Sequence, residues 1–335
     1  MIRVLVTGAS GFVGRALCSA FLEQGLKVRA AVRSVVSMPL IPGLEIATIG
    51  EVCENTDWST ALQGVDCVVH CAARTHVMRE TVDDALAAYR AVNVAGTICL
   101  AEQAAALNVR RLIFVSSIKV NGEQTGAGAP FCVDGLSWDS IAHGNKMNPL
   151  DPYGLSKLEA EQALWIISGR TGLEVVVVRP PMVYGPGVKG NMLSLLRWVV
   201  SGVPIPLGAV DNKRSMIGLC NLADLLLRCV EHPGATGRTF LASDGQDIST
   251  PQIIRLMAQG INRPVHLLSV PVSLLQAGGW LLGRRDEIDR LTGSLQIDSA
   301  VTQSQLDWSP PVSVDDGVRQ MAKWYADNRY ALAAL

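Results

Sequence analysis

The feature that most constrains the fold is a glycine-rich turn close to the N-terminus. The β-branched run 2–7 leads directly into Gly8, Gly11 and Gly14, and a helical pattern then continues to Gly25. Strand, glycine turn and helix in this order are typical of the first unit of a dinucleotide-binding α/β fold. The spacing is G-x-x-G-x-x-G, whereas the commoner fingerprint is G-x-G-x-x-G. The first glycine still permits the tight turn, and the last still lets the helix pack on the sheet.

The start of this helix is expected to hold the pyrophosphate of a dinucleotide. Free backbone N–H groups and the positive end of the helix dipole favour an anion there, and Gly11 lets the backbone approach it. The alternative is a structural turn without a ligand. The residues predicted to contact the cofactor in this turn are Gly8, Ser10, Gly11, Phe12, Val13 and Gly14.

The rest of the first half alternates short β-branched runs with longer helical patterns, which predicts βαβ units and a parallel sheet. A length of 335 residues suggests two structural units at roughly 150 residues each. The predicted fold class is α/β, a Rossmann-like doubly wound parallel sheet with a smaller mixed C-terminal substrate domain. We expect the dinucleotide-binding domain to comprise residues 1–180 with 219–245 returning to it, and the substrate domain 181–218 and 246–335.

The end of the second predicted strand bears on the choice of cofactor. An NAD site usually has Asp or Glu there, about 20 residues after the glycine turn, to bind the ribose 2′-hydroxyl. Here Val32 stands at that position, followed by Arg33 and Ser34. Because a guanidinium binds phosphate well, the sequence favours NADP(H), with Arg33 on the 2′-phosphate. NAD(H) is the alternative, in which Arg33 is a solvated loop residue.

A tyrosine and a lysine stand at the start of a long helical pattern at 152–171. Tyr153 and Lys157 share one helix face, and Ser117 directly follows a predicted strand at 111–116. A phenol has a pKa near 10, and a neighbouring ammonium favours its ionised form. This set is suited to proton transfer at a substrate oxygen that a serine holds in place.

Five segments form an ordered set of motifs along the chain: TGASGFVG, VNVAGT, FVSS, YGLSK and RPPMVYGPG. This set closely resembles the extended short-chain dehydrogenase/reductase family, in its nucleotide-sugar epimerase/dehydratase branch. The resemblance covers nearly the whole chain. It implies that Tyr153 is the acid/base, that Lys157 binds the nicotinamide ribose and tunes the tyrosine, and that Ser117 orients the substrate.

The resemblance also implies which residues meet the two ligands. Beyond the glycine turn and Arg33, the implied cofactor contacts are Ala72, Ala73, Asn93, Ser116, Tyr153, Lys157 and Pro180. The implied substrate contacts are Ser117, Lys119, Asn191, Arg214 and Arg290, with the diphosphate assigned to Asn191 and Arg214. For Lys119 a solvated position is the alternative.

Departures from the family pattern bear on the reaction. The family often has an asparagine where Met182 stands and a second tyrosine where Asn121 stands. Its dehydratase branch has an acidic pair after the orienting serine, where this chain has Ile118 and Lys119. These departures argue against 4,6-dehydration and against an ordinary hexose 4-epimerase.

The hydride balance separates the remaining reactions. An epimerase returns its hydride and retains NAD⁺, whereas a reductase consumes one hydride per turnover and gains from the NADPH pool. Arg33 and the missing carboxylate therefore favour NADPH-dependent reduction of the C4 keto group of a UDP-4-keto-6-deoxy-N-acetylhexosamine, for bacterial surface-polysaccharide synthesis. An NAD-retaining 4-epimerase is the alternative. A non-catalytic dinucleotide sensor is disfavoured, because it has no need of Ser117, Tyr153 and Lys157.

Charge and composition exclude other classes of protein. A net charge of −1 gives no basic surface for nucleic acid, and no stretch is long and apolar enough for a membrane span. No metal site is expected from the scattered histidines, and His70 is expected to be a core histidine with satisfied nitrogens. Without a secretory signal or a CxxC pair, we expect a cytoplasmic protein. The resemblance implies a homodimer through the long helices at 81–107 and 152–171, although their alanine-rich faces would also suit packing on the sheet.

Overall fold

One large parallel sheet decides where the other elements lie. The structure is a computed structural model, and it describes residues 1–34, 41–75, 84–126, 128–133 and 151–332. The sheet has seven strands in the order β3-β2-β1-β4-β5-β6-β9, all parallel. The strands are β1 (Arg3–Thr7), β2 (Lys27–Val32), β3 (Glu45–Thr48), β4 (Cys67–His70), β5 (Arg111–Val115), β6 (Glu174–Arg179) and β9 (Arg238–Leu241). The predicted α/β doubly wound fold class is confirmed.

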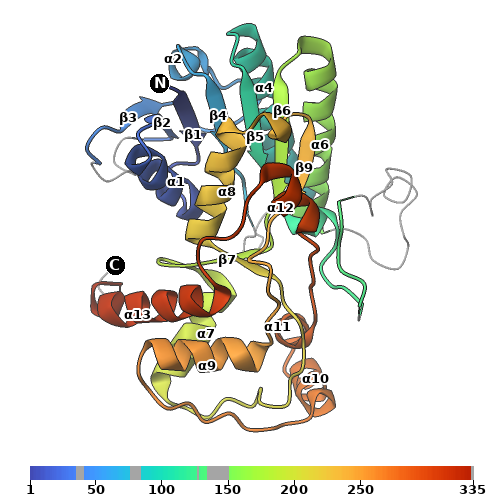
Figure 1. Ribbon diagram of the computed structural model, residues 1–335. Coiled ribbons are helices and arrows are strands. Elements are labelled where there is room, and N and C mark those ends of the chain that lie inside the picture. The colour runs from blue at the N-terminus through green and yellow to red at the C-terminus, as the bar shows by residue number, and fades with distance from the viewer. Residues whose placement is uncertain (35–40, 76–83, 127, 134–150, 333–335) are drawn as a thin grey trace.

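The central strands are apolar because helices cover both faces of the sheet (Figure 1). Every residue of β4 and β5 is buried. One face carries α1 (Phe12–Glu23) and α8 (Leu219–Glu231), which pack on each other. The other face carries α2 (Ser59–Leu62), α3 (Ala85–Arg90), α4 (Gly96–Ala106) and α6 (Pro152–Thr171). The strand order reverses between β1 and β4, and the carboxyl ends of these strands are where open α/β folds bind ligands.

The segment between 81 and 107 is helical in its described part, but it is not one regular helix. After α3, the backbone forms a single π-helical turn over Ala91–Ala95, and α4 follows. A π-turn inserts one residue per turn and is frequent at functional sites. Asn93 lies in this turn, and residues 76–83 lie outside the described residues.

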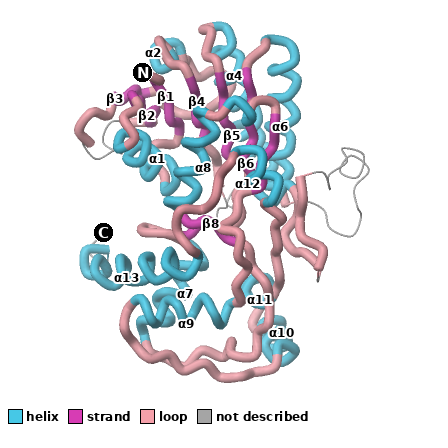
Figure 2. Tube along the Cα trace, viewed as in Figure 1, coloured by secondary structure: helices cyan, strands magenta, loops and turns pink. Residues whose placement is uncertain are grey.

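A second group of elements lies beyond the carboxyl edge of the sheet (Figure 2). The short strands β7 (Met182–Tyr184) and β8 (Met216–Gly218) form a parallel pair. Helices α7 (Gly190–Ser201), α9 (Thr250–Gly260) and α13 (Val314–Leu332) pack around a separate apolar cluster that includes Leu196, Met257 and Met321. The remaining elements are α10 (Val272–Leu281), α11 (Arg285–Thr292), α12 (Ala300–Leu306) and two 3-10 turns, Ile118–Val120 and Pro233–Ala235.

The aromatic ring of Phe12 connects the glycine turn to this second group. Phe12 is the first residue of α1, yet it packs against the cluster around α7, α9 and α13. The chain crosses between the two groups several times, so the domain boundaries expected from the sequence stay a prediction. Within the described residues, no helix is long and apolar enough to cross a bilayer.

Candidate active site at the carboxyl edge of the sheet

The glycine turn lies where the strand order reverses, beside the end of β4. Gly8 has a φ of +63°, and a Cβ there would come within 2.8 Å of the backbone nitrogen of Ala72. A Cβ on Gly14 would collide with the carbonyl oxygen of Gly8. Both positions therefore require glycine. The turn leaves bare backbone at the N-terminus of α1, which fits the pyrophosphate of a dinucleotide.

A buried chain of hydrogen bonds runs from this turn to the π-helical turn. Thr97 donates to the Asn93 carbonyl (2.6 Å), so Thr97 accepts from Nε2 of His70 (3.0 Å). The other ring nitrogen, Nδ1, then accepts from Thr7 (2.6 Å), whose oxygen accepts from the Ala72 N–H (3.1 Å). Burial lowers the pKa of His70 to about 3, so the ring is neutral and both nitrogens are satisfied. His70 is thus a structural residue, as the sequence predicted.

Asn93 carries this chain on to helix α6. Its Oδ1 accepts from the Arg74 N–H (2.8 Å), and its Nδ2 donates to Ser156 Oγ (2.9 Å) and to the Arg74 carbonyl (3.1 Å). Ser156 in turn donates to the carbonyl of Tyr153 (2.8 Å). Asn93 therefore joins the segment after β4 to the first turn of α6. Its support of the cofactor side stays a prediction.

Helix α6 begins where it does because Asp151 caps it. Asp151 Oδ1 accepts from the N–H of Gly154 (2.6 Å), and Pro152 occupies the first helical position, where its missing N–H costs nothing. The carbonyl of Lys119 lies 3.0 Å from where a Gly154 Cβ would be. This close contact sets the first turn of α6, which carries Tyr153, against the segment that follows β5.

Tyr153 and Ser117 meet at this contact. The Ser117 hydroxyl interacts with the phenol and favours its ionised form, but burial dominates and raises the pKa of Tyr153 to about 12. The ring of Tyr89, on α3, packs edge-on against Tyr153 with 6.0 Å between ring centroids. The structure thus brings together the predicted acid/base and the predicted orienting serine.

Lys157 lies one turn further along α6 and is buried. Its Nζ donates to the Val115 carbonyl (2.9 Å) and lies 4.3 Å from the centroid of the Phe114 ring. Burial lowers the pKa of Lys157 to about 8. The direct effect of its ammonium on the phenol, which the sequence suggested, has no counterpart among the recorded contacts of the described residues. Lys157 thus points at the end of β5.

The Ser116 hydroxyl faces the protein interior. It donates to Glu161, which also receives two bonds from Arg179, Nε to Oε1 (3.0 Å) and Nη2 to Oε2 (2.5 Å). Arg179 also donates to Oδ1 of Asn121 (3.1 Å). Glu161 and Arg179 are buried. This ion pair joins α6 to the ends of β5 and β6 directly beneath the candidate site. Cofactor contact by Ser116 stays a prediction.

Two other predicted residues lie at neighbouring strand ends. Pro180 follows β6, and its carbonyl accepts from the N–H of Ile118 (2.9 Å), which fixes the Ser117 segment against β6. Ala73 follows Ala72 after β4. The carboxyl ends of β1, β4, β5 and β6 therefore carry the predicted cofactor wall as a continuous edge.

Arg33 has a carboxylate beside it. Its Nη1 lies 3.3 Å from Oε1 of Glu51, and both side chains are largely exposed. Glu51 follows β3, whereas the carboxylate of an NAD site was sought at the end of β2. A 2′-phosphate on Arg33 would therefore approach a negative charge, so this surface is less suited to NADP than Arg33 alone suggested.

Three predicted substrate residues line one small cavity of about 120 Å³, next to Met182. They are Asn191, at the start of α7, Arg214, after β7, and Arg290, on α11. Arg214 Nη1 donates to the carbonyls of Arg290 (2.8 Å) and Gly293 (3.1 Å). Its Nε is buried and has no hydrogen-bond partner in the described structure. An orphaned buried guanidinium N–H at a cavity fits an anionic ligand group.

Lys119 is not among the residues of that cavity. Its Nζ forms ion pairs with Asp151 and with Glu123 (2.6 Å). Glu123 lies four residues further along the chain and is the more exposed of the two partners. The 3-10 turn over Ile118–Val120, with Ser117 accepting from the Lys119 N–H (3.2 Å), sets this direction. Direct contact of Lys119 with a substrate stays a prediction.

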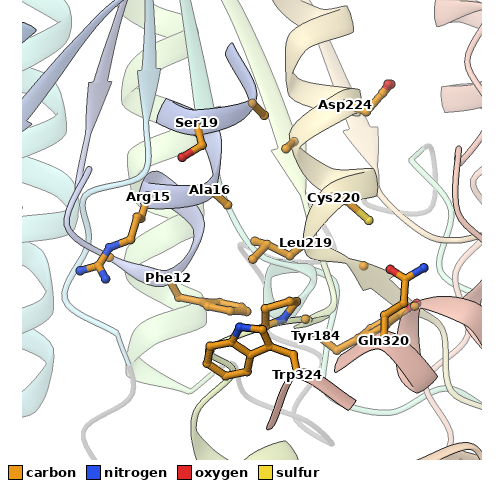
Figure 3. Close-up of a pocket in the computed structure, with 18 of the residues that line it drawn as sticks. Phe12, Arg15, Ala16, Ser19, Tyr184, Leu219, Cys220, Asp224, Gln320 and Trp324 are labelled. Atoms are coloured by element: carbon orange, nitrogen blue, oxygen red, sulfur yellow. The ribbon is translucent and has the colours of Figure 1, made fainter. Parts of the chain in front are cut away.

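A larger cavity, about 870 Å³, lies between α1, α8 and α13 (Figure 3). Phe12 and Trp324 lie side by side at its foot, and Arg15 and Cys220 flank it from α1 and α8. It reaches the glycine turn through Ser10 and Gly11. Among the described residues, no three His, Cys, Asp or Glu side chains gather as they would around a metal ion.

Sequence reasoning missed Glu51, Asp151, Glu161 and Arg179. Asp151 had a signal, because Asp before Pro at a helix start is a capping pattern. Glu161 also had one, since it lies one helical turn after Lys157. Glu51 and Arg179 had none, because the pairing of β2 with β3 brings Glu51 to Arg33, and the packing of α6 against β6 brings Glu161 to Arg179.

The geometry can be compared with known proteins. The family model described as "NAD dependent epimerase/dehydratase family" matches residues 4–242. The chain is 43% identical over 330 residues to the UDP-glucose 4-epimerase of Vibrio cholerae, which covers 97% of both chains. It is 28% identical over 302 residues, or 89% of this chain and 83% of the other, to the N-acetyl-alpha-D-glucosaminyl-diphospho-ditrans,octacis-undecaprenol 4-epimerase of Escherichia coli O157:H7.

A solved structure gives the same fold. The UDP-glucuronic acid 4-epimerase of Bacillus cereus, in complex with NAD, superposes with a TM-score of 0.76 at 20% identity, covering 97% of this chain and 99% of that one. At this identity the likeness concerns the fold alone.

Proposed function

Because this chain belongs to the NAD-dependent epimerase/dehydratase family, we propose that it is a nucleotide-sugar 4-epimerase that retains NAD. The observation that carries the proposal is the 43% identity, over nearly the whole of both chains, to a UDP-glucose 4-epimerase. That relative favours the epimerase, which was the alternative in the sequence analysis, over the NADPH-dependent 4-ketoreductase that the sequence favoured.

The cofactor proposed is NAD. Glu51 beside Arg33 supports it, because a carboxylate disfavours a 2′-phosphate and accepts hydrogen bonds from a 2′-hydroxyl. The glycine turn would hold the pyrophosphate, Ala72 and Ala73 would line the dinucleotide, and Lys157 would bind the nicotinamide ribose. When bound, the oxidised nicotinamide supplies a hydride acceptor for C4 of the sugar.

The substrate proposed is a UDP-hexose. Arg214, Arg290 and Asn191 would hold its diphosphate, and the unpartnered Nε of Arg214 supports this. Held there, the sugar would extend toward Ser117 and Tyr153. Ser117 would hold O4, and the Tyr153 phenolate would remove the O4 proton while the C4 hydride leaves. The 4-keto sugar would then rotate in the site and present the opposite face of C4. Tyr153 would return the proton to O4 as the hydride returns to that face.

The experiment uses the purified chain without added cofactor. The protein is denatured, and the released dinucleotide is identified by chromatography. The native protein is then incubated with UDP-glucose and separately with UDP-N-acetylglucosamine, and the 4-epimers are quantified. We expect bound NAD and conversion of at least one sugar with no lasting absorbance change at 340 nm. Tyr153→Phe should fold normally and lose activity by at least about 10²-fold.

One result would replace the proposal by the ketoreductase. A UDP-4-keto-6-deoxy-N-acetylhexosamine is mixed with the protein and either NADPH or NADH. Oxidation of one NADPH per sugar reduced, together with no epimerisation and no bound NAD, would show a net reduction. Bound pyridine nucleotide with neither activity would favour the non-catalytic sensor, and absence of any pyridine nucleotide would contradict all three readings.

A further inference from the structure

A cluster of three charged side chains joins the predicted serine segment to the start of α6. Lys119 lies two residues after Ser117, and Asp151 lies two residues before Tyr153. The Lys119 ammonium is ion-paired with Asp151 and with Glu123. The side chains of Lys119 and Asp151 are only 27% and 21% exposed, so water and salt screen this pair less than a surface pair.

Asp151 serves two purposes that conflict. One oxygen caps α6 through the N–H of Gly154, which fixes the position of Tyr153. Its negative charge, however, disfavours the phenolate and raises the pKa of Tyr153. The other oxygen binds Lys119. The Lys119 ammonium therefore offsets part of this charge while the cap is kept.

Other groups also face Tyr153. Ser117, after β5, favours the phenolate, whereas Tyr89, on α3, raises the pKa of Tyr153. The Arg74 guanidinium lies 5.6 Å from the centroid of the Tyr89 ring. The Lys157 ammonium is bound to Val115. Of these groups, Asp151 carries the negative charge closest along the chain, and Lys119 is its cationic partner.

We propose that Lys119 is a positioning residue that offsets the charge of Asp151 and holds the first turn of α6 against the Ser117 segment, so that Asp151 can cap α6 while opposing ionisation of the Tyr153 phenol less. The inference rests on the acid/base role proposed for Tyr153. It assigns Lys119 a role through Asp151, where the sequence had suggested direct contact with substrate.

The test uses four variants of the full chain: Lys119→Met, Lys119→Arg, Asp151→Asn and the double variant Lys119→Met/Asp151→Asn. Asn keeps the cap of α6 and removes the charge. The acid limb of kcat/KM against pH is measured for each. Independently of activity, the Tyr153 phenolate is titrated by its ultraviolet absorbance as the difference from Tyr153→Phe. The exposed Lys323→Met, on α13, is the control for loss of a cation.

The signs are opposite for the two single charge variants. Lys119→Met leaves Asp151 unpaired, so the limb and the phenol titration should move up by about half to one pH unit, a three- to tenfold loss of kcat/KM on the acid side. Asp151→Asn should move both down. The double variant should return near the wild-type profile. Lys119→Arg and Lys323→Met should each match the wild type.

The inference is overturned if Lys119→Met lowers the rate equally at every pH with an unchanged phenol titration, or if adding Asp151→Asn to Lys119→Met does not restore the wild-type profile. If the circular dichroism of one single charge variant differs from that of the wild type, the other single variant tests the inference, because the two expected shifts have opposite signs. If the wild type has no epimerase activity, the proposed function fails, whereas the phenol titration still reads the coupling between Lys119 and Asp151.

Discussion

Lys157 illustrates how the interior of the fold sets the chemistry of a single residue. Its ammonium is almost completely buried at the end of β5, and burial lowers its pKa to about 8. In the unfolded chain a lysine has a pKa near 10.4. Between these values the unfolded state binds more protons than the folded state, so the free energy of unfolding rises with pH in this window. The charged lysine therefore costs stability below pH 8.

Replacing Lys157 by Met should stabilise the protein while removing activity. We expect a gain of roughly 1–3 kcal/mol in the free energy of unfolding below pH 8, reduced by the lost contacts with Val115 and Phe114. The gain should shrink as pH rises and vanish above about pH 10.4. Urea unfolding of both proteins at a series of pH values measures this. A gain independent of pH would show that packing, and not charge burial, is responsible.

At the residue scale, site residues could be predicted from the sequence where they belong to a short local motif. Ser117, Tyr153 and Lys157 stand in short motifs, and the structure brings the first two into contact. Arg33 was identified, but Glu51 was not, because the register of β2 on β3 brings them together and no local spacing encodes it. The direct effect of Lys157 on Tyr153 was inferred from their helical spacing, and that spacing does not say where a long side chain turns.

At the element scale, a buried ion pair ties α6 to β6. Glu161 accepts from Arg179 and Ser116, so each charge depends on the other. Glu161→Gln keeps the shape of the side chain but leaves Arg179 buried without its counter-charge, which should cost about 3–5 kcal/mol. Urea unfolding with an unchanged m value is the measurement.

The matched variant replaces both charges. Glu161→Leu together with Arg179→Met should recover most of that loss, since two apolar side chains need no partner. A cost below about 1 kcal/mol for Glu161→Gln alone would mean that water reaches the pair and screens it as it would a surface pair.

The glycine turn allows a second prediction at this scale. Gly14→Ala forces a Cβ against the Gly8 carbonyl, so α1 must shift away from the turn and binding of NAD should weaken by at least about tenfold. Gly169→Ala, in α6, has no atom within 4 Å of its Cβ and should gain about 0.5–1 kcal/mol of stability. Calorimetric titration of stripped protein with NAD measures binding. Unchanged affinity in Gly14→Ala would show that the turn does not hold the cofactor.

Elements were predictable where periodicity is long. The helical pattern at 152–171 and the predicted strand at 111–116 agree closely with α6 and β5. The pair β7–β8 was missed because three-residue strands carry no measurable alternation and one of them follows two prolines. The π-turn at Asn93 was missed because its sequence, AVNVA, reads as ordinary helix.

At the scale of the whole molecule, a polar hub joins the two groups of elements. Asp244, after β9, accepts from the Tyr184 hydroxyl (2.7 Å), from Asn221 Nδ2 (2.7 Å) and from the Gly218 N–H (3.0 Å). Gly317, on α13, packs on the Tyr184 ring so closely that a Cβ would lie 2.7 Å from its oxygen. Strand ends, α8 and α13 therefore meet at one buried carboxylate.

Tyr184→Phe should destabilise both groups together. It removes one donor from Asp244 and should cost about 1–3 kcal/mol, while Tyr325→Phe, on the half-buried ring of α13, should cost under about 0.5 kcal/mol. Tryptophan fluorescence and far-ultraviolet circular dichroism follow urea unfolding. Both signals should shift to the same lower midpoint. Two separated midpoints would show that the groups unfold independently.

The path of the chain through β6, α7, β9, α9, α12 and α13 has a consequence for how such a molecule can change. The chain returns from the second group of elements to the sheet, because α12 packs against β9 before α13 packs on α9. The second group is therefore not one continuous segment that a single crossover could exchange. A single crossover would join an incomplete sheet or an incomplete second group to the other parent. Point substitutions at positions such as Met182 and Asn121, which differ from the family pattern, would by contrast leave these contacts between elements in place.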